Sequence, residues 1–330
     1  MRVLVTGGAG FIGSHLAERL LLADHEVVCL DNFNDFYDPE LKRRNIEKAL
    51  SYNHYTLAVG DILDKDLLNK LFSDPFDAVV HLAAYAGVRP SIMRPAKYQR
   101  MNVEGTVNLL EQCRMKEVPK FIFASSSSVY GGRTTVPFQE TDDVTRPISP
   151  YAATKVAGEA LCHTYHYLFG MNIHALRFFT VYGPRQRPEM AIHLFANRIQ
   201  RGETIAVFGD GKSARDYTYI DDIVDGVTAS VDRCSGYEII NIGGSKTTSL
   251  MDLVKMLSNR LNKPPIIQQM PDQPGDVPIT YADVTKAKNL LGYAPQTDIV
   301  QGIEKFCAWL KTQPPEEAFG KKDRISSLPI

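Results

Sequence analysis

Near its N-terminus the chain reads Arg2-Val-Leu-Val-Thr6-Gly7-Gly-Ala-Gly10-Phe-Ile-Gly13, an apolar run of strand length that leads through a glycine-rich turn into a helical pattern. A glycine at position 7 permits the tight turn, Gly10 lets the backbone approach a pyrophosphate, and Gly13 lets the helix pack closely on the strand. The amides at the start of the helix then face the phosphates. This order of strand, turn and helix predicts a dinucleotide-binding site.

Acidic residues at two later strand ends extend this prediction. The apolar run that starts at Glu26 ends at Asp31, whose carboxylate would accept hydrogen bonds from the ribose hydroxyls and repel a 2′-phosphate, so NAD is favoured over NADP. Asp61 follows the next strand and is a candidate acceptor for the adenine amine. The run 77–84 ends in small residues, which suit the close approach of a cofactor, and we expect His81 within it to be a packed core residue.

Strand and helix patterns alternate over the first half of the chain, which predicts an α/β fold with a doubly wound parallel (Rossmann) sheet. We expect helices at residues 11–23, 39–50, 64–72, 95–115 and 150–169. Beyond Tyr182-Gly-Pro184 glycine and proline become denser, which indicates a smaller α/β C-terminal substrate domain. The expected division is 1–180 with a returning segment at about 215–240, then 181–214 with 241–315, and a polar tail at 316–330.

The composition excludes several classes of partner. The net charge of the 330 residues is −1 with acids and bases interspersed, so no nucleic acid is expected, and Lys42-Arg43-Arg44 is interpreted as a solvated helix face. The sequence has no signal-peptide pattern and no apolar run of membrane length, so no membrane partner is expected. The five cysteines are scattered without C-x-x-C pairing, which favours reduced thiols in a cytoplasmic protein and argues against a metal site.

Tyr151-Ala-Ala-Thr-Lys155 places a proton carrier and a positive charge on one helix face, because residues four apart are neighbours there. A free tyrosine has a pKa of ~10 and is a poor base at neutral pH, but a nearby ammonium favours the phenolate. The strand pattern before this helix ends in four serines, Ser125 to Ser128, and such strands deliver their carboxyl ends to the ligand crevice. The alternative for the tyrosine and lysine alone is a solvated helix face.

Further motifs follow in an order that is specific to one family. They are Gly60-Asp61, His81 to Ala84, Asn102-Val-Glu-Gly-Thr106, Ser126 to Gly131, Arg177-Phe-Phe-Thr180, Tyr182-Gly-Pro184 and Arg215 to Asp222. With the glycine turn and the tyrosine–lysine pair, they make the chain resemble the extended short-chain dehydrogenases/reductases, specifically the nucleotide-sugar epimerases.

The resemblance implies roles for particular residues. Tyr151 would take the proton from a sugar hydroxyl, Lys155 would hold the nicotinamide ribose and lower the pKa of the tyrosine, and Ser126 would hydrogen-bond the same hydroxyl. NAD would stay bound and be regenerated in each turnover, and a homodimer would pair through the helices at 102–115 and 151–167. The implied cofactor-binding set is Gly7, Gly10, Phe11, Ile12, Gly13, Asp31, Asn32, Asp61, Ile62, Leu82, Ala83, Ala84, Asn102, Tyr151 and Lys155.

Departures from related subfamilies indicate the sugar. Sugar-nucleotide 4,6-dehydratases carry Asp-Glu before Val-Tyr-Gly and glucuronate decarboxylases carry a glutamate there, where this chain has Ser127 and Ser128. Glucose/galactose epimerases usually have asparagine in place of Thr180. The chain therefore most resembles the UDP-glucuronate 4-epimerases, which interconvert UDP-glucuronate and UDP-galacturonate through a 4-keto intermediate without decarboxylation. UDP-glucose 4-epimerase, UDP-glucuronate decarboxylase and a non-catalytic NAD-sensing regulator remain as alternatives.

The resemblance implies a UDP-sugar substrate, which the C-terminal domain would bind. Hydroxyls of Ser127, Ser128 and Thr180 would hold the sugar carboxylate, and Arg187 and Arg215 would bind the diphosphate, for which planar bidentate donors are suited. The implied substrate-binding set is Ser127, Ser128, Arg89, Thr180, Arg185, Arg187, Met190, Val207, Phe208, Arg215 and Asp276.

Overall fold

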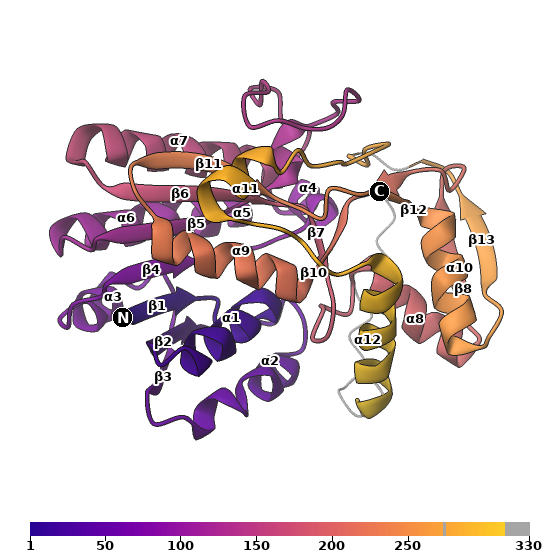
Figure 1. Ribbon diagram of the computed structural model, residues 1–330, viewed down its shortest axis with the longest axis horizontal. Coiled ribbons are helices and arrows are strands. Elements are labelled where there is room, and N and C mark those ends of the chain that lie inside the picture. Colours follow the sequence, from indigo (N-terminus) through magenta and orange to yellow (C-terminus); the bar gives the residue numbers. More distant parts are fainter. Residues whose placement is uncertain (273–274, 314–330) are drawn as a thin grey trace.

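The computed structural model describes residues 1–272 and 275–313, so the tail predicted at 316–330 lies outside the described residues. Its centre is a seven-stranded sheet in the order β11-β6-β5-β4-β1-β2-β3, in which every neighbouring pair is parallel (Figure 1). The strands are β1 (Arg2–Thr6), β2 (Glu26–Asp31), β3 (Tyr55–Val59), β4 (Ala78–His81), β5 (Lys120–Ser126), β6 (Asn172–Phe178) and β11 (Tyr237–Ile242). The predicted doubly wound parallel sheet is confirmed.

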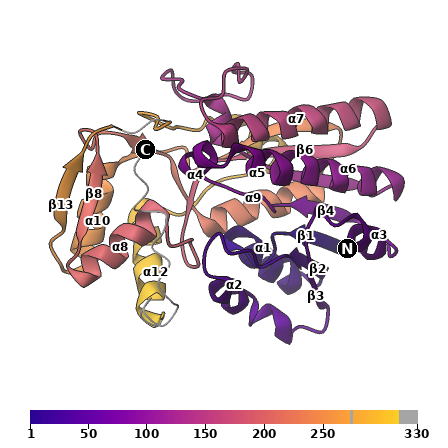
Figure 2. The same cartoon turned by 180° about the vertical axis from the view of Figure 1, so that it is seen from behind.

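Helices cover both faces of this sheet, because successive strand residues point to opposite faces and both sets are apolar. Val3 and Val5 of β1 pack in one core with α1 (Phe11–Leu22) and α9 (Ile220–Arg233). Leu4, between them, packs in a second core with α6 (Gly105–Met115) and α7 (Pro150–Phe169). The α6 and α7 face is the one seen in Figure 2. On this face α3 (Lys65–Leu71) lies beside α6. On the opposite face α2 (Pro39–Ile46) lies beside α1.

The expected helix at 95–115 contains an irregular segment. It consists of α5 (Pro95–Gln99), a π-helical turn at Arg100–Glu104 and α6 in direct succession. The short α4 (Val88–Met93) precedes it, and 3-10 turns lie at Ala49–Ser51 and Ser127–Tyr130. The other predicted helices differ from the observed bounds only near their ends, except that the expected 39–50 helix ends at Ile46.

The C-terminal part adds smaller elements next to the carboxyl ends of the central strands (Figure 1). Two-stranded sheets join β7 (Thr180–Tyr182) to β10 (Tyr217–Tyr219), β9 (Ala214–Arg215) to β12 (Thr248–Ser249) and β8 (Thr204–Phe208) to β13 (Ile266–Met270). The helices are α8 (Ala191–Arg201), α10 (Leu250–Leu261), α11 (Thr285–Leu291) and α12 (Ile299–Thr312). The chain returns to the main sheet through α9 and β11, and α11 packs on them. The boundary at residue 180 stays a prediction.

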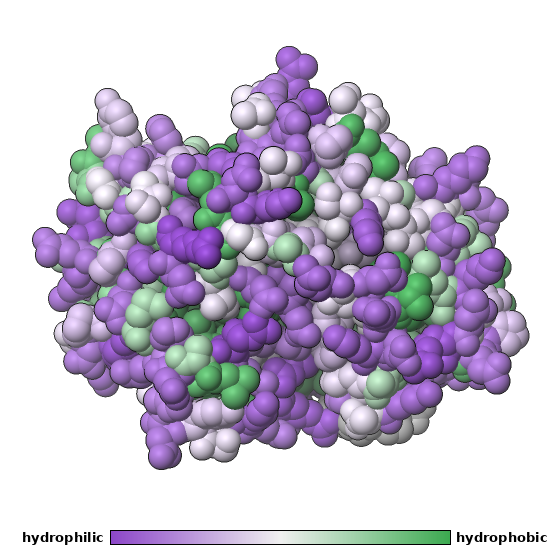
Figure 3. Space-filling model, viewed as in Figure 1, coloured by the Kyte–Doolittle hydropathy of each residue, from purple (hydrophilic) through white to green (hydrophobic). Residues whose placement is uncertain are grey.

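Several sequence-based expectations concern single side chains or the surface. His81 is buried and hydrogen-bonded to the hydroxyls of Thr6 and Thr106, both at 2.9 Å, so its interpretation as a core residue is confirmed. All five cysteines are free and buried. The face shown in Figure 3 is mainly hydrophilic, with apolar residues in small separate groups. No helix in the described part of the chain is long and apolar enough to cross a membrane.

Candidate active site

A cavity of about 370 Å³ lies at the carboxyl ends of the central strands. It runs from the glycine turn after β1 past Asp31 and Asp61 to the end of β5 and the start of α7. A smaller cavity of about 150 Å³ adjoins it, and Ser127, Ser128 and Thr180 line both. The position matches the crevice where doubly wound sheets bind ligands.

The glycine turn has the shape that a dinucleotide phosphate requires. A Cβ on Gly13 would lie 2.3 Å from the carbonyl oxygen of Gly7, and one on Gly7, where φ is +69°, would lie 2.9 Å from the Ala83 nitrogen. The helix, the turn and the segment after β4 can approach each other this closely only because both residues lack side chains. Gly10 is the N-cap of α1, with no side-chain cap and no acidic residue in the first turn. The helix amides are therefore free to bind an anion.

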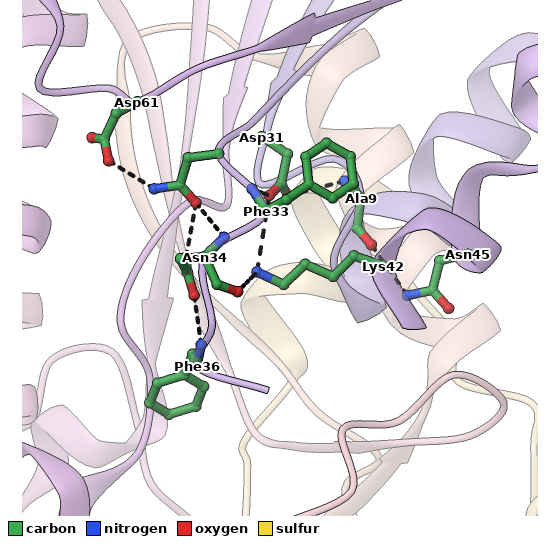
Figure 4. Close-up of polar contacts among 9 residues, drawn as sticks. Ala9, Asp31, Phe33, Asn34, Phe36, Lys42, Asn45 and Asp61 are labelled. Carbon is green, nitrogen blue, oxygen red and sulfur yellow. Dashed lines mark hydrogen bonds and ion pairs between the residues drawn. The ribbon is translucent and has the colours of Figure 1, made fainter. Parts of the chain in front are cut away.

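The loop after β2 fixes the acidic groups of the predicted ribose and adenine sites (Figure 4). The Asp31 carboxylate accepts hydrogen bonds from the amides of Ala9 (3.2 Å) and Phe33 (2.9 Å). Asn32 donates from Nδ2 to Oδ2 of Asp61 at 2.7 Å. All three predicted polar residues of this region line the cavity. Together with the glycine turn they fit a dinucleotide with free ribose hydroxyls.

Lys42 corrects the interpretation of Lys42-Arg43-Arg44 as a solvated helix face. The Lys42 side chain is buried, lines the cavity, donates to the carbonyl oxygen of Asn34 at 3.0 Å and lies 4.0 Å from Oδ1 of Asp31. Lys42 lies on the inward face of α2 together with Asn45 and Ile46, which follow it by three and four residues and are also buried. That spacing was the signal in the sequence.

The predicted catalytic residues meet at the other end of the cavity. Ser149 caps α7 by accepting from the amide of Ala152 at 3.1 Å, which fixes the start of the helix that carries Tyr151 and Lys155. Lys155 donates from Nζ to the carbonyl oxygen of Ala124 at 2.6 Å, and this nitrogen lies 5.9 Å from the centroid of the Tyr151 ring. Ser126 follows Ala124 by two residues, so β5 and α7 bring the three side chains together.

The electrostatics of this group differ from the expectation for the tyrosine. Burial raises the pKa of Tyr151, while a hydrogen bond with Ser126 and the charge of Arg187 oppose the rise. Burial also lowers the pKa of Lys155 to about 8, although Cys162 and Glu159 oppose this change. The predicted lowering of the tyrosine pKa by Lys155 is therefore not produced by the protein's own groups. The physical reason is that desolvation disfavours both charged forms.

Asn102 lies behind the cavity wall and is absent from the residues that line it. Its Oδ1 accepts from the amide of Tyr85 at 2.9 Å, and its Nδ2 donates to the Tyr85 carbonyl and to Oγ1 of Thr154, both at 3.0 Å. Thr154 in turn donates to the carbonyl oxygen of Tyr151 at 2.7 Å. In this structure the side chain joins the π-helical turn to α7.

The predicted substrate residues are divided by the structure. Arg187 and Met190 line the large cavity, whereas Arg215 and Asp276 line the small one. Arg89 and Phe208 line neither cavity. Nη2 of Arg89 is 2.7 Å from Oδ2 of Asp276, and its guanidinium lies 4.6 Å from the Phe208 ring centroid.

Two further predicted substrate residues, Arg185 and Val207, also line neither cavity. The Arg185 side chain points away from the cavities, because its guanidinium donates to Glu18 at 2.6 Å and to Ser14 at 3.3 Å on α1. Its backbone is left-handed, with φ +65°. Val207 is buried in β8 and lines neither cavity.

Aromatic residues of the cavity wall were missed by the sequence analysis. They are Phe36, Tyr37, Tyr85, Phe178 and Phe179. The first two directly follow the Asp31 loop, where two adjacent aromatic residues in a polar stretch were the available signal. Within residues 1–272 and 275–313, no group of three or more His, Cys, Asp or Glu side chains could hold a metal ion.

Comparisons with known proteins agree with this geometry. The family model described as the NAD dependent epimerase/dehydratase family matches residues 3–243. A UDP-glucuronate 4-epimerase of Thermodesulfobacterium geofontis is 42% identical over 93% of this chain and 95% of its own length. A crystal structure of the UDP-glucuronic acid 4-epimerase of Bacillus cereus, in complex with UDP-glucuronic acid and NAD, is 40% identical with a TM-score of 0.90, covering 94% of this chain and 99% of that chain.

A UDP-glucose 4-epimerase from Thermotoga maritima, solved with UDP-glucose, is similar at lower identity. It is 33% identical with a TM-score of 0.86, and the match covers 94% of this chain and 99% of the other. The family model covers more than half of the chain and the relatives match nearly its full length. The chain therefore belongs to the NAD dependent epimerase/dehydratase family.

Proposed function

We propose that the protein is a UDP-glucuronate 4-epimerase, which interconverts UDP-glucuronate and UDP-galacturonate through a 4-keto sugar and without decarboxylation. One observation carries this proposal. The dinucleotide cavity, which holds the catalytic group of Tyr151, Lys155 and Ser126, shares a wall of three hydroxyl side chains with a small cavity. Two of the relatives named above, which share about two fifths of their residues with this chain, are UDP-glucuronate 4-epimerases by name.

The residues of the chain perform the acid–base part of the reaction. Bound NAD supplies the hydride acceptor and donor, together with a positive charge near the tyrosine. Tyr151 takes the proton of the sugar 4-hydroxyl as C4 is oxidised and returns it when C4 is reduced on the other face. Ser126 hydrogen-bonds the same hydroxyl, and Lys155 is fixed for its role by the carbonyl of Ala124. Each turnover leaves no net redox change.

Inversion requires a firmly held nucleotide and a sugar that can turn over. Arg215 and Asp276 line the small cavity and are our candidates for the diphosphate and the uridine ribose. Arg187 reaches the large cavity, where its guanidinium lies 5.4 Å from the Phe36 ring centroid. Binding energy placed on the nucleotide leaves the keto-sugar free to present its second face.

The hydroxyl-lined wall explains why the carboxylate is retained. Oxidation at C4 makes a ketone β to the carboxylate, and such acids lose CO2 readily. Ser127, Ser128 and Thr180 line the wall shared by the two cavities and can donate hydrogen bonds to the carboxylate. Each such bond to a charged group contributes about 1.5–3 kcal/mol. Bonds that stabilise the charge and fix its rotation slow the loss of CO2.

The deciding experiment supplies the purified enzyme with UDP-glucuronate and reads the products by NMR. We expect UDP-galacturonate and no UDP-pentose. A pentose product would identify a decarboxylase instead, and absence of turnover would favour the NAD-sensing regulator. A parallel reaction with UDP-glucose tests the UDP-glucose 4-epimerase alternative, for which we expect a kcat/KM at least about tenfold lower, corresponding to ~1.4 kcal/mol.

We also propose that the protein acts as a cytoplasmic homodimer that pairs through α6 and α7. The C-terminal parts of these helices expose large apolar side chains, with exposed fractions of 52% for Met115, 79% for Tyr167 and 60% for Leu168. Five free cysteines support a reducing compartment. Light scattering coupled to gel filtration would measure the mass, and a monomer at micromolar concentration would contradict the dimer.

A further inference from the structure

Asp31 and Lys42 bring opposite charges to one point in the wall of the dinucleotide cavity. Their exposed fractions are 6% and 4%, and Nζ of Lys42 lies 4.0 Å from Oδ1 of Asp31. Lysine is almost never buried to this degree without a partner. Arg43, the next residue on α2, has 59% of its side chain exposed. Of these two neighbouring cations, only Lys42 is buried.

The loop holds the two side chains in place by separate contacts (Figure 4). The Asp31 carboxylate is anchored by the amides of Ala9 and Phe33, while the ammonium of Lys42 donates to the carbonyl oxygen of Asn34. An ammonium carries three donors, and the carbonyl engages one of them. At 4.0 Å the carboxylate neutralises Lys42 without a direct hydrogen bond. We expect the ammonium to keep its position when the carboxylate is removed, because the Asn34 carbonyl still accepts its hydrogen bond.

Neighbouring charges reinforce this arrangement. Besides Asp31, the charges that act on Lys42 are those of Arg187 and Asp35. Arg187 is itself paired with Glu189 at 3.0 Å, so with Asp31 present these two cations face three carboxylates. Without Asp31 two cations face two carboxylates, and the carboxylate nearest to Lys42 no longer repels an anion.

We propose that Lys42 is a latent ligand for a ribose 2′-phosphate, and that the preference for NAD over NADP depends on the pair of Asp31 and Lys42. A carboxylate at the end of the second strand accepts hydrogen bonds from a 2′-hydroxyl and repels a 2′-phosphate, whereas a nearby cation accommodates that phosphate. Both the carboxylate and the cation are present here, and the negative charge of Asp31 offsets the positive charge of Lys42. Removing one carboxylate is then enough to admit NADP. This inference rests on the dinucleotide site and is independent of the sugar that the enzyme converts.

The test measures bound nucleotide instead of turnover. The enzyme and its variants are equilibrated with equal concentrations of NAD and NADP, freed of unbound nucleotide and unfolded, and the released nucleotides are separated by chromatography. We expect Asp31→Ser to raise the NADP:NAD ratio at least about 100-fold, because repulsion is lost and a charge-assisted contact is gained. Serine retains a hydroxyl that can accept from the amide of Phe33.

The second variant measures the contribution of Lys42 to NADP binding. Asp31→Ser/Lys42→Met should bind NADP about 10- to 100-fold less well, relative to NAD, than Asp31→Ser does. The matched control Asp31→Ser/Arg43→Met removes an exposed charge from the same helix and should change the ratio less than about threefold, since solvent screens that charge. Equal ratios in Asp31→Ser and Asp31→Ser/Lys42→Met would overturn the proposal, as would an Asp31→Ser variant that still binds only NAD. If circular dichroism shows that Asp31→Ser does not fold, Asp31→Asn provides the same comparison.

Discussion

Arg177 of β6 and Glu159 of α7 form a double hydrogen bond beneath the catalytic group, with Nε to Oε1 at 2.9 Å and Nη2 to Oε2 at 2.8 Å. Both side chains are almost fully buried. Glu159 also accepts from the hydroxyl of Ser125, the neighbour of Ser126. The ion pair therefore ties α7, which carries Tyr151 and Lys155, to the two strands behind the site.

Breaking this pair on one side should strongly destabilise the fold. Arg177→Met leaves the Glu159 carboxylate buried without its cation, which costs about 3–5 kcal/mol in the free energy of unfolding. Replacing both partners, as Arg177→Met/Glu159→Leu, should cost much less, because no buried charge is left. Urea unfolding followed by circular dichroism measures both. The partly exposed pair of Arg114 and Glu111 is the control, and Arg114→Met should cost about 1 kcal/mol. If Arg177→Met lowers the free energy of unfolding by less than Arg114→Met does, the role assigned to the buried pair is contradicted.

Removal of the phenolic hydroxyl should abolish most of the activity. Tyr151→Phe keeps the ring and the helix but removes the proton carrier, so kcat should fall about 10²- to 10⁴-fold. The amount of NAD bound per subunit should not change. Tyr167→Phe, on the exposed face of the same helix, is the matched control and should retain kcat. Turnover of Tyr151→Phe within about tenfold of the unaltered enzyme would assign the proton transfer to another group.

Burial of Lys155 predicts a specific dependence of stability on pH. The folded-state pKa is about 8, against an ordinary value of 10.5, so the unfolded state binds more protons between these two pH values. The contribution of Lys155 to stability therefore rises as the pH increases from 8 to 10.5. Lys155→Met should remove this rise, on the order of 3 kcal/mol in total. Chemical denaturation at a series of pH values measures it, with Lys48→Met, whose side chain is 58% exposed, as the control. Identical pH slopes for Lys155→Met and the unaltered protein would show that the lysine does not titrate in this range.

A methyl group in the glycine turn should remove the cofactor. Gly13→Ala places a Cβ 2.3 Å from the carbonyl oxygen of Gly7, which forces the turn and α1 apart. We expect a loss of ~1–3 kcal/mol in stability and of most of the bound NAD. Gly132→Ala is the matched control, because its Cβ meets no atom within 4 Å. NAD released by acid and measured by absorbance distinguishes the two. A full complement of NAD in Gly13→Ala would show that the close packing is not required.

Loss of the hydroxyl wall should change the product. In Ser127→Ala/Ser128→Ala the sugar carboxylate loses hydrogen bonds worth about 1.5–3 kcal/mol each, so the 4-keto sugar should lose CO2 in part of its turnovers. NMR of the products should then show UDP-pentose beside UDP-galacturonate. Ser125→Ala is a useful comparison, since its hydroxyl is directed to Glu159. A double variant that still forms no pentose would disprove the assignment of this wall.

The predicted site residues that the structure brings together in one cavity lie on short stretches of chain. The glycine turn, Asp31 and the Tyr151–Lys155 pair each lie within one strand end or one helical turn, where geometry follows from local spacing. Arg185 was assigned to the substrate, but it binds Glu18, a residue far away in the sequence. Lys42 was assigned to the solvent, although it is buried against the Asp31 loop. The contact of Arg185 depends on how distant segments meet, which local patterns do not encode. The burial of Lys42 is local, and the spacing to Asn45 and Ile46 indicated it.

The wall formed by Ser127, Ser128 and Thr180 borders both cavities and begins one residue after Ser126. Under the proposed function, sugar choice and proton transfer thus depend on the adjacent carboxyl ends of β5 and β6. An engineer who wants another hexose must alter side chains adjacent to the machinery without shifting its backbone. Small substitutions at these three positions, not exchange of the C-terminal lobe, are the direct route to such an enzyme.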